Sequence, residues 1–413
     1  MKRRRFSSKR ILRNVNEKDK RVVEMRVFQI NSVCGIRSTG RICTDLAETL
    51  EKHGHESKIA YGRETVPQKY QKYAVRIGNN TSVKIDALKT RLFDNAGFNS
   101  KRATKKLIRQ IEEYNPDVIH LHNLHGYYLN VECLFTYLKT CGKKVVWTLH
   151  DCWSFTGHCA HFDFVGCKKW HNACERCPQK KKYPKSALMD KSKRNYSKKK
   201  ELFTGIPNMT IVTPSQWLAD LVKKSFLKEY DVRVIRNGID INVFQPTESN
   251  LREQYNLQDK KILLGVASVW DERKGLNDFI ALSHSLDKRY QIVLIGVSKS
   301  QIKLLPSNII GIERTNDVTE LAQWYTVADV FLNLTYEDNY PTVNLEAQAC
   351  GTPVITYATG GSVESVAPSM VVKQGDLEGL QKLLLKDNHC EDLLFAGFSK
   401  EACYDKYIDL YEE

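Results

Sequence analysis

The sequence predicts an α/β protein built from two doubly wound, Rossmann-like domains. From residue 25 onward, short apolar segments with the length of strands alternate with amphipathic segments with the length of helices. The strand segments are apolar throughout, as expected for parallel sheets covered by helices on both faces. The chain of 413 residues is long enough for two or three domains. No internal repeat or low-complexity array suggests another architecture.

The composition is that of an ordinary globular protein. Hydrophobic residues make up 42% and charged residues 27% of the sequence. No apolar run approaches the roughly eighteen residues of a membrane span, and the basic N-terminus lacks the apolar core of a signal peptide. We therefore expect a cytoplasmic protein.

Charge and cysteine content narrow the range of partners. A net charge of +15 favours anionic partners such as nucleotide diphosphates, lipid phosphates, a membrane face or nucleic acid, and charge alone does not choose among them. Twelve cysteines in a chain without an export signal argue against a disulfide framework. Reduced thiols or a bound metal are the expected explanations.

The first 24 residues form a separate segment. They are polar and basic with little apolar periodicity, which predicts a disordered extension. Met25 stands directly before the first clear strand, so we also hypothesise that it begins the natural protein. A peptide spanning residues 24 and 25 in the natural protein would contradict that hypothesis.

The first domain is predicted over residues 25–236 and opens with a strand at residues 26–30. A turn containing Gly35 and Gly40 follows, and a helix then places Ile42, Leu46 and Leu50 on one face. A glycine-containing turn between a strand and a helix exposes backbone amides at a helix N-terminus, where anions bind. The plainer alternative is a tight turn without a ligand.

Two histidines mark the carboxyl ends of strands in this domain. Strands 116–122 and 145–151 end near His122 and His150, after strand 58–62 and helix 104–114, with helix 130–141 between them. Ligands of parallel sheets gather beyond the carboxyl ends of strands. Two histidines on neighbouring strands therefore indicate a binding site, and the alternative is that both are structural.

Five cysteines fall within an insertion at residues 152–177. Cys174 and Cys177 have the CxxC spacing of metal ligands, and Cys159 and Cys167 supply a second pair. We hypothesise a structural zinc held by these four thiolates. The alternatives are reduced thiols or redox-labile bridges.

Residues 180–200 are strongly basic, with ten lysines and arginines and one aspartate. Such a run is usually a solvated face. The alternative is a surface that docks on anionic lipid head groups.

The second domain is predicted over residues 237–396, after strands 210–214 and 232–236 flank helix 215–226. Its strands are expected at residues 261–268, 291–296, 309–313 and 330–335, and its helices at 318–328 and 376–384. Arg273 and Lys274 lie at the turn after the first of these strands. Two positive charges there suit a diphosphate, because they neutralise a leaving group as its charge develops.

The stretch 335–361 organises the second domain. Pro341 is expected to open a helix that is apolar on nearly every side, ends at Gly351 and leads into strand 353–357. The start of this helix offers free amides to a phosphate. Glu346 lies inside the helix, where a buried carboxylate needs a partner, and a ribose diol is a suitable one. The alternative is that Glu346 faces water.

The spacing of Asp338, Pro341 and Glu346, continued as Leu-Glu-Ala-x-Ala-Cys-Gly-Thr-Pro-Val, resembles the acidic-x7-acidic signature of family 4 retaining glycosyltransferases. Residues 35–40 are similar to the donor loop of that family, 148–151 to its donor-histidine segment, 237–246 to its hinge and 273–275 to its diphosphate-binding turn. The resemblance covers residue 25 to the C-terminus and implies the GT-B fold, in which two domains face one cleft. In such folds the last helix, here residues 397–413, crosses back onto the first domain.

The resemblance also implies roles for individual residues. Catalysis is assigned to His150, Lys274, Asp338 and Glu346. Binding of the nucleotide sugar is assigned to Gly35, Ser38, Thr39, Gly40, Arg273, Lys274, Glu337, Asn339, Asn344 and Glu346. His150 would position the sugar, Glu346 would hold the ribose, and either Glu337 or Asp338 would orient the sugar. Asp151 is expected to meet an acceptor hydroxyl, and Ser268 stands where the family usually has a second basic residue.

The implied activity is retaining transfer of a hexose from a UDP- or GDP-sugar, without a catalytic metal, to a hydroxyl of a growing glycan. The acceptor is expected to be linked to a lipid such as a polyprenyl diphosphate, and the product to be a surface polysaccharide. The hexosyltransferase would then work in the cytoplasm, at the inner face of the membrane. The alternatives are a GT-B nucleotide-sugar epimerase and a non-catalytic sugar-nucleotide-binding module. A zinc-knuckle nucleic-acid protein would leave the stretch 335–361 unexplained, so we expect no nucleic-acid partner.

Overall fold

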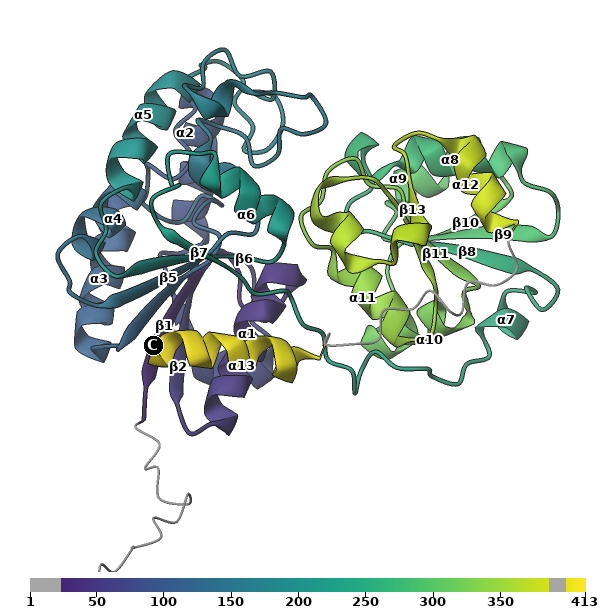
Figure 1. Cartoon of the computed structure of the whole chain (residues 1–413), viewed down its shortest axis with the longest axis horizontal. Helices are drawn as coiled ribbons and strands as arrows, with labels where there is room; N and C mark the ends of the chain where they lie inside the picture. The colour runs from purple at the N-terminus through teal and green to yellow at the C-terminus, as the bar shows by residue number, and fades with distance from the viewer. Residues whose placement is uncertain (1–23, 386–398) are drawn as a thin grey trace, which may run out of the picture.

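The computed structural model describes residues 24–385 and 399–413, which form two α/β lobes side by side (Figure 1). The disordered extension expected at residues 1–24 lies outside the described residues except for Glu24, and so does residue 397, where the last helix is expected to begin. Each lobe contains one parallel sheet, which confirms the predicted fold class.

The first lobe is built on a seven-stranded sheet with the order β3-β2-β1-β4-β5-β6-β7, and every neighbouring pair is parallel. Its strands are β1 (Arg26–Asn31), β2 (Glu56–Tyr61), β3 (Ala74–Arg76), β4 (Val118–Leu121), β5 (Lys144–Thr148), β6 (Met209–Thr213) and β7 (Asp231–Val234). Its helices are α1 (Arg37–Lys52), α2 (Asn80–Phe93), α3 (Lys101–Tyr114), α4 (Val131–Leu138), α5 (Ser192–Phe203) and α6 (Gln216–Lys223), with short 3-10 turns at Gln68–Tyr73, Trp153–Phe155 and Lys169–His171. The chain order reverses between β1 and β4, the position at which doubly wound sheets bind ligands.

The second lobe is built on a six-stranded sheet with the order β10-β9-β8-β11-β12-β13, again parallel throughout. Its strands are β8 (Lys261–Val266), β9 (Tyr290–Ile295), β10 (Ile309–Ile312), β11 (Val330–Asn333), β12 (Val354–Tyr357) and β13 (Val371–Val372). Its helices are α7 (Leu251–Gln254), α8 (Leu276–Ser285), α9 (Lys299–Ile302), α10 (Val318–Val327), α11 (Thr342–Ala349) and α12 (Leu377–Leu384), with 3-10 turns at Glu272–Lys274, Gly360–Ser365 and Pro368–Met370.

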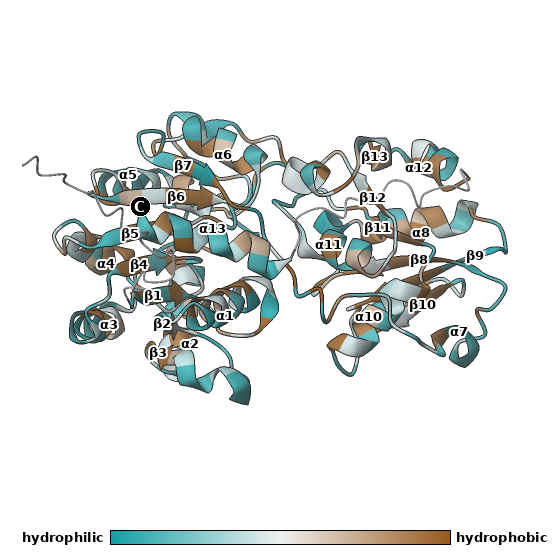
Figure 2. Ribbon diagram, turned by 60° about the horizontal axis from the view of Figure 1, so that its bottom comes forward, coloured by the Kyte–Doolittle hydropathy of each residue, from teal (hydrophilic) through white to brown (hydrophobic). Residues whose placement is uncertain are grey.

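The central strands lie inside both lobes because most of their side chains are apolar on both faces, whereas the edge strands β3 and β7 are more exposed. All residues of β4, β11 and β12 are buried. Figure 2 shows the hydrophobic colour concentrated on the strands, with hydrophilic residues on the outer faces of the helices. Each lobe therefore has its own apolar core.

Helix α13 (Lys400–Glu412) belongs to the first lobe although it follows the second in sequence. Figure 1 shows it alongside α1. Tyr404, Tyr407 and Tyr411 are buried in one cluster with Leu46 and Leu50 of α1. The hydroxyl of Tyr411 lies 2.6 Å from Nδ1 of a buried histidine, His120. The chain therefore crosses between the lobes twice.

Within residues 24–385 and 399–413, no helix combines the length and the apolar character that crossing a bilayer requires.

Candidate active site

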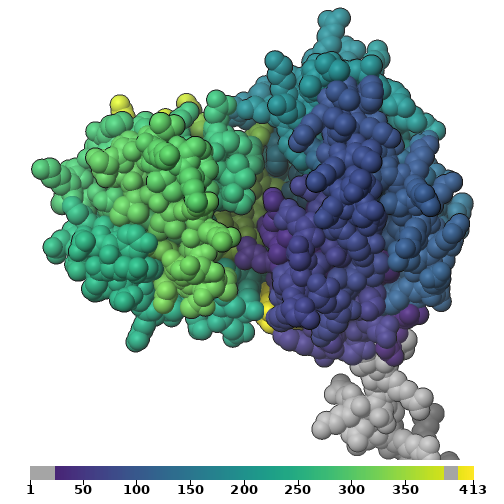
Figure 3. Space-filling view, turned by 180° about the vertical axis from the view of Figure 1, so that it is seen from behind, coloured from purple at the N-terminus to yellow at the C-terminus, as the bar shows by residue number. Residues whose placement is uncertain are grey.

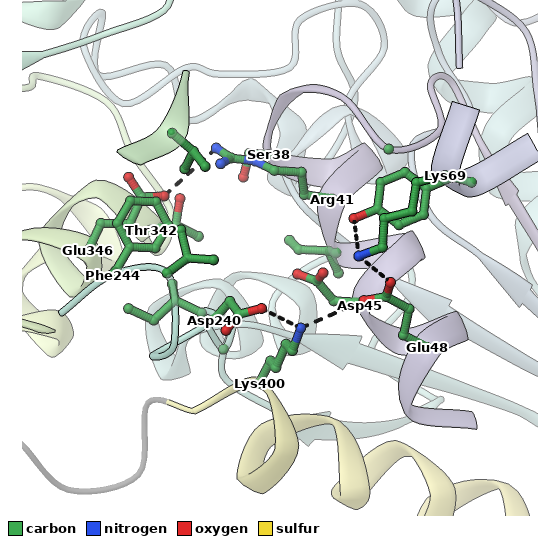
Figure 4. Close-up of a pocket in the computed structure, with 17 residues that line it drawn as sticks. Ser38, Arg41, Asp45, Glu48, Lys69, Asp240, Phe244, Thr342, Glu346 and Lys400 are labelled. Carbon is green, nitrogen blue, oxygen red and sulfur yellow. Dashed lines mark hydrogen bonds and ion pairs between the residues drawn. The ribbon is translucent and has the colours of Figure 1, made fainter. Parts of the chain in front are cut away.

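Two cavities lie in the cleft between the lobes, which the space-filling view shows from behind (Figure 3). The larger cavity, of about 540 Å³, is lined by the turn after β1, the loop after β4 and parts of the segment 161–183, and on the second lobe by the loops after β8 and β11. The smaller cavity, of about 330 Å³, lies between α1, α11 and residues 238–244 (Figure 4). The larger cavity thus lies at the carboxyl ends of strands from both sheets.

Lys274 and Asp338 form a close ion pair on the second lobe. Lys274 ends the 3-10 turn that Asp271 caps, and its Nζ lies 2.5 Å from Oδ2 of Asp338. Burial opposes ionisation of Asp338, but the charges of Lys274 and Arg273 outweigh it, so the pKa of Asp338 is lowered. The Asp338 carboxyl is therefore ionised at neutral pH.

Arg273 turns toward the larger cavity. Its Nη1 donates to the backbone oxygen of Glu337 at 3.2 Å, and it lines the cavity together with Ser268. No carboxylate of the described residues lies within salt-bridge distance of Arg273. Three other cations that line the same cavity are paired: Lys274 with Asp338, Arg37 with Glu64 at 2.8 Å, and Lys182 with Glu272 at 3.6 Å. Arg273 is thus the second-lobe cation that faces the cavity without a carboxylate partner.

Glu337 lines the larger cavity, whereas Asp338 holds Lys274. Glu337 is 5% exposed, and its Oε1 accepts a hydrogen bond of 2.9 Å from the amide of Phe164, in the first lobe. Burial raises the pKa of Glu337 although the Phe164 amide and Arg273 act against it. Of the two acids that the sequence leaves open, Glu337 is the one placed to meet a ligand in this cavity.

The glycine turn after β1 differs in detail from the prediction. Helix α1 begins at Arg37, so Ser38, Thr39 and Gly40 lie in the helix itself, and no side chain caps its start. Gly35 has a φ of +72°, and its amide donates to the oxygen of Gly40 at 3.0 Å. That amide is therefore already used within the turn. Ser38 lines the smaller cavity and Thr39 the larger one, so the helix start lies between them.

The smaller cavity contains an ion pair that joins the two lobes (Figure 4). Glu346, in α11, is 3% exposed, and its Oε2 accepts a hydrogen bond of 3.0 Å from the hydroxyl of Tyr325. Its Oε1 lies 3.8 Å from Nη2 of Arg41, on α1 of the other lobe. The expectation that Glu346 is buried with a partner is met. Arg41 was missing from the predicted site, and its position one turn after Arg37, on the cleft side of α1, is the signal that points to it.

His150 and His122 lie together as their positions at strand ends suggest. Their rings are stacked at 12°, with Nδ1 of His122 3.1 Å from Nε2 of His150. Nε2 of His122 lies 3.2 Å from Oε1 of Gln29. Burial lowers the pKa of His150 to about 4 and that of His122 well below its usual value, so both rings are neutral at pH 7. His150 is partly exposed but lines neither of the two cavities.

Two predicted donor-binding asparagines are engaged within the protein. Asn344 is fully buried, accepts from Asn333 at 2.8 Å and donates to Ser365 at 2.9 Å. Its amide ties α11 to the neighbouring β11, and a contact with the nucleotide sugar stays a prediction. Asn339 contacts the first lobe at both ends of its amide, through Ser215 and through the backbone oxygen of His150 at 3.3 Å. Asn339 therefore joins the two lobes.

Asp151 faces the interior of the first lobe. Its Oδ2 lies 2.7 Å from Nε2 of His125, and the other imidazole nitrogen, Nδ1, lies 2.9 Å from the hydroxyl of Tyr183. His125 and Tyr183 line the larger cavity, and Asp151 supports His125 from behind. Asp151 thus contacts His125, and the predicted contact of Asp151 with an acceptor hydroxyl stays a prediction.

Cys159, Cys167, Cys174 and Cys177 surround one small cavity in the first lobe. All four are free thiols, and burial raises the pKa of Cys174 to about 11. A hydrogen bond from Cys159 lowers the pKa of Cys177 to about 7. In the part of the chain that the structure describes, no group of three or more His, Cys, Asp or Glu side chains is arranged to hold a metal ion. The geometry therefore gives the zinc hypothesis no support, and metal analysis of the purified protein tests it directly.

The basic run at residues 180–200 is not one uniform surface. Its second half forms α5, in which Lys199 is 1% exposed. Nζ of Lys199 donates to the backbone oxygens of Trp153 and Thr156 at 2.7 and 3.1 Å, and burial lowers its pKa to about 7. Lys199 thus anchors the cysteine-rich segment to α5 and does not face solvent.

Two family models match the chain. The model described as Glycosyltransferase Family 4 matches residues 39–243, and the model described as Glycosyl transferases group 1 matches residues 260–386. These spans contain most of α1, the ends of strands β4 and β5, the Arg273 turn and the acidic signature. The chain belongs to the family 4 glycosyltransferases. It is therefore an enzyme that transfers a sugar.

This glycosyltransferase is similar to the putative colanic acid biosynthesis glycosyl transferase WcaC of Escherichia coli, with 23% identity across 94% of this chain and all of WcaC. A shorter match, 27% identical over 47% of this chain and 57% of the relative, is to a Campylobacter jejuni enzyme named N,N'-diacetylbacillosaminyl-diphospho-undecaprenol alpha-1,3-N-acetylgalactosaminyltransferase. Both relatives are glycosyltransferases by name.

Solved structures share the fold. Sucrose-phosphate synthase from Thermosynechococcus elongatus aligns with a TM-score of 0.68 and 18% identity over 94% of this chain and 98% of that one. Anabaena HepE, solved with UDP-glucose, aligns with a TM-score of 0.63 and 13% identity over 94% of this chain and 100% of its own. The glycosyltransferase thus has the GT-B fold.

Proposed function

We propose that this glycosyltransferase moves a hexose, with retention of configuration, from a UDP- or GDP-sugar to a hydroxyl of a lipid-linked glycan in surface polysaccharide biosynthesis. The observation that carries the proposal is the wall of the larger cavity. There Arg273 faces inward beside the fixed Lys274–Asp338 pair, and the start of α1 lies across the cleft. Fixed cations and oriented amides stabilise a diphosphate that gains charge as it leaves.

For diphosphate binding in this cavity, the positions of the charged side chains matter more than their net charge. Its lining carries the cations Arg37, Arg63, Lys182, Arg273 and Lys274 against the acids Glu64, Asp271, Glu272 and Glu337. Because Arg37, Lys182 and Lys274 are paired, the attraction for a diphosphate rests on Arg273, on Arg63 and on the helix amides. Glu337 would then contact the sugar, and Glu346 would bind the ribose in the adjoining smaller cavity in place of Arg41.

The names of relatives support the type of pathway. WcaC is named for colanic acid biosynthesis, and a Staphylococcus aureus relative, CapM, for capsular polysaccharide biosynthesis. The Campylobacter jejuni relative is named for an undecaprenol diphosphate acceptor, and HepE was solved with UDP and glucose. By analogy with these relatives, we propose that this enzyme uses a nucleotide-sugar donor and a polyprenyl-diphosphate-linked acceptor.

An exposed apolar surface on the first lobe supports peripheral binding to a membrane. Ile85, Leu88 and Phe93 of α2 are 49%, 56% and 40% exposed, and Leu188 and Met189 are 68% and 45% exposed. Hydrogen bonds from the amides of residues 187 and 189 to the oxygens of residues 91 and 92 hold the two segments together. These five side chains, here called the α2 patch, are suited to insertion between lipid head groups.

Basic side chains accompany the α2 patch. The exposed cations on its two segments are Lys84, Lys89, Arg91, Lys181, Lys182 and Lys185; of the nearby acids, Asp86 and Asp94 are buried and Asp190 is exposed. Such cations attract anionic lipid. Tyr183, five residues before Leu188, lines the larger cavity. A lipid-linked acceptor held beside the patch would therefore have its sugar close to the cleft.

Donor binding and turnover test the proposed function. Thermal-shift measurements with UDP- and GDP-sugars should find at least one stabilising donor. Arg273→Ala and Lys274→Ala should each lower its turnover by on the order of a hundredfold or more, whereas Lys299→Ala, at an exposed lysine on the second lobe, should not. Epimerised donor formed without any acceptor would indicate an epimerase, and binding without turnover would indicate a binding module. No affinity for any nucleotide sugar would contradict the proposal.

A further inference from the structure

Arg63 lies on the first-lobe side of the larger cavity, just after the end of β2. Two neighbouring cations on this side have carboxylate partners: Arg37 pairs with Glu64, and Lys182 pairs with Glu272 of the second lobe. No carboxylate in the described parts of the chain lies within salt-bridge distance of the Arg63 guanidinium. Among the described cations on the first-lobe side of the cavity, Arg63 is therefore the one whose charge no ion pair neutralises.

Neutral groups hold the Arg63 side chain in place. Its backbone amide donates a hydrogen bond of 2.9 Å to the oxygen of Ser32, which fixes the turn after β2 against the end of β1. Cζ of Arg63 lies 5.8 Å from the centre of the Tyr127 ring. The chain at Gly126 packs alongside, since a Cβ there would lie 3.6 Å from Cδ and 3.7 Å from Nη1 of Arg63. An aromatic ring attracts a cation without neutralising it, so the guanidinium is positioned and can still bind an anion.

Three residues near Arg63 have backbone conformations that are rare outside glycine. The φ angles are +56° at Arg37, +65° at Glu64 and +69° at Tyr127. Glu64 follows Arg63 directly, Arg37 is the ion-pair partner of Glu64, and Tyr127 contacts the Arg63 guanidinium. Residues with a Cβ seldom adopt these angles, and those that do gather at ligand sites, where the surrounding structure enforces them. Three such residues from three separate turns indicate that this part of the cavity is a binding site.

The two sides of the cavity differ in charge. Among the lysine, arginine and acidic side chains that line it, positive charges outnumber negative ones on the first lobe, and negative charges outnumber positive ones on the second. These side chains are Arg37, Arg63, Lys182 and Glu64 on the first lobe, and Arg273, Lys274, Asp271, Glu272 and Glu337 on the second. Under the proposed function the diphosphate of the donor binds at Arg273, on the second lobe. The first lobe therefore offers an anion site to the other substrate.

We propose that Arg63 binds an oxyanion, either a phosphate or a carboxylate, carried by the sugar acceptor. This inference rests on the proposed glycosyl transfer and adds a charged group to its acceptor. Arg63 and Arg273 both attract anions that enter the cavity, but because they belong to different lobes, each can contact its own anion. The planar guanidinium donates two parallel hydrogen bonds to a phosphate or a carboxylate. The oxyanion is not the reacting hydroxyl, so its binding does not fix the side from which that hydroxyl attacks.

The oxyanion has two possible sources, and the surroundings of Arg63 bear on both. Burial raises the pKa of Tyr183, and the nearby charges of Arg63 and Arg37 act against that rise. Tyr183 also lines the larger cavity and precedes Leu188 of the α2 patch by five residues. A phosphate at Arg63 would belong to the lipid diphosphate of an acceptor whose lipid lies at the patch. A carboxylate would belong to an acidic sugar, such as a uronic acid, in the growing glycan.

The test measures whether the affinity for a sugar depends on its charge. Three probes are titrated by ligand-observed NMR: methyl glucoside is neutral, methyl glucuronide carries a carboxylate, and glucose 1-phosphate carries a phosphate. UDP or GDP, whichever stabilises the protein in the thermal-shift measurements, is present at saturation, so that the phosphate of the probe cannot bind in the donor site. The wild type should bind at least one charged probe about tenfold or more tightly than methyl glucoside. Preference for glucose 1-phosphate would indicate the lipid diphosphate as the source, and preference for methyl glucuronide an acidic sugar.

Variants of Arg63 connect this preference to one side chain. Arg63→Gln removes the charge and should bind the three probes with equal affinity, whereas Arg63→Lys keeps the charge without the planar fork and should retain part of the preference. Arg109→Gln should keep the wild-type preference, because Arg109 is exposed on α3 of the same lobe and does not line the cavity. Melting temperatures show whether each variant is folded. If Arg63→Gln is unstable, Arg63→Lys still tests the proposal, because it should lose affinity for the charged probe and not for methyl glucoside.

Three results would overturn the oxyanion site. Equal affinities of the wild type for the three probes would mean that the cavity does not select a charged acceptor. A charge preference that survives in Arg63→Gln would place the anion at another cation. Loss of UDP or GDP affinity in Arg63→Gln as large as that in Arg273→Ala would assign Arg63 to the diphosphate of the donor. If instead the wild type binds no nucleotide sugar, the proposed function itself fails, and with it the assignment of the anion to an acceptor.

Discussion

Nδ1 of His122 lies 3.1 Å from Nε2 of His150, and this contact decides which nitrogen of His150 can meet a substrate. The chain of hydrogen bonds begins at Gln29, whose Nε2 donates to Cys43 and to Ser57 at 3.0 and 3.1 Å. Its Oε1 therefore faces His122 and accepts the hydrogen of Nε2 at 3.2 Å. Neutral His122 then accepts from His150 at Nδ1, which leaves Nδ1 of His150 with a free lone pair.

Replacing Gln29 should change the tautomer of His150, although Gln29 does not contact His150 directly. In Gln29→Leu, the acceptor that fixes the tautomer of His122 is lost, and the hydrogen on His150 is no longer confined to Nε2. We expect the nitrogen shifts of His150 to indicate a mixture of tautomers and the KM for the donor to rise about tenfold, the cost of about one hydrogen bond. Ser57→Ala is the control, because Gln29 keeps its bond to Cys43. Wild-type shifts and KM in Gln29→Leu would show that Gln29 does not set the tautomer.

The sequence predicted the features that depend on local pattern. Apolar strand segments and amphipathic helices gave two parallel sheets because burial on both faces leaves a continuous apolar run. The buried position of Glu346 and the pairing of His122 with His150 also followed, since helix periodicity and strand ends place these side chains. These inferences need only neighbours along the chain or the general geometry of parallel sheets.

Contacts between distant segments could not be predicted in this way. Arg41 pairs with Glu346 across the cleft, and Asn339 bonds to Ser215 in the other lobe. No local spacing encodes either pair, because each depends on how two lobes meet. Asn344 was placed in the site for its position in the motif, yet its amide is used by the core. A motif therefore identifies the region of a site more reliably than the direction of each side chain.

Helix α2 was not predicted from the sequence, and the reason is physical. Its outer face carries Ile85 and Leu88, whereas Asp86 and Thr90 face inward. This reverses the usual pattern of apolar residues inside and polar residues outside. When the apolar side chains of a helix lie on its exposed face, the sequence shows no apolar face that would pack against a sheet, and the helix is hard to predict.

Glu346 should recognise the ribose of the nucleotide. Glu346→Gln should weaken UDP or GDP binding by about ten- to a hundredfold, because hydrogen bonds from hydroxyls to a charged acceptor are lost. Glu346→Gln should weaken binding of the 2′-deoxy nucleotide much less, because that nucleotide lacks one of the hydroxyls. Isothermal titration calorimetry of both nucleotides with the wild type and Glu346→Gln gives the coupling free energy between the Glu346 side chain and the 2′-hydroxyl.

Glu48→Gln is the matched control for Glu346, since Glu48 lines the same smaller cavity from the first lobe. It should leave the difference between the two nucleotides unchanged. Equal losses for the ribo and deoxy nucleotides in Glu346→Gln would mean that the carboxylate contacts some other part of the donor.

The α2 patch should bind anionic bilayers. The double substitution Leu88→Ser and Leu188→Ser removes the two most exposed leucines of the patch and should reduce sedimentation with phosphatidylglycerol vesicles at least tenfold, because inserted leucines contribute through burial of apolar area. Leu304→Ser is the control, since Leu304 is 81% exposed on the second lobe. Phosphatidylcholine vesicles should bind the wild type weakly, and donor hydrolysis should be unaffected throughout.

Two outcomes would count against a membrane role for the α2 patch. Equal vesicle binding by the double variant and the wild type would place the membrane contact elsewhere. A wild type that forms dimers in light scattering, and a double variant that is monomeric, would assign the patch to contact between two copies of the chain.

Stability near neutral pH should depend on Asp45. This residue lines the smaller cavity with Glu48, Asp240 and Lys400, and Nζ of Lys400 lies 2.6 Å from Asp240 and 3.7 Å from Glu48. Burial raises the pKa of Asp45 to about 6, with repulsion from Glu48 and Asp240 adding to it and attraction from Lys400 acting against it. The folded state thus holds the Asp45 proton more tightly than the unfolded chain does. The resulting stabilisation is complete below pH about 4 and is lost as pH rises through 6.

The advantage of Asp45→Asn over the wild type in melting temperature should therefore be larger at pH 8 than at pH 5, by about 2 to 5 °C. Differential scanning calorimetry of both proteins at the two pH values measures this difference. Asp259→Asn, at an exposed position on the second lobe, should show no such change with pH. A difference between Asp45→Asn and the wild type that is the same at pH 5 and pH 8 would mean that Asp45 does not titrate between these values. The effect of the substitution would then come from packing against Lys400 and not from charge.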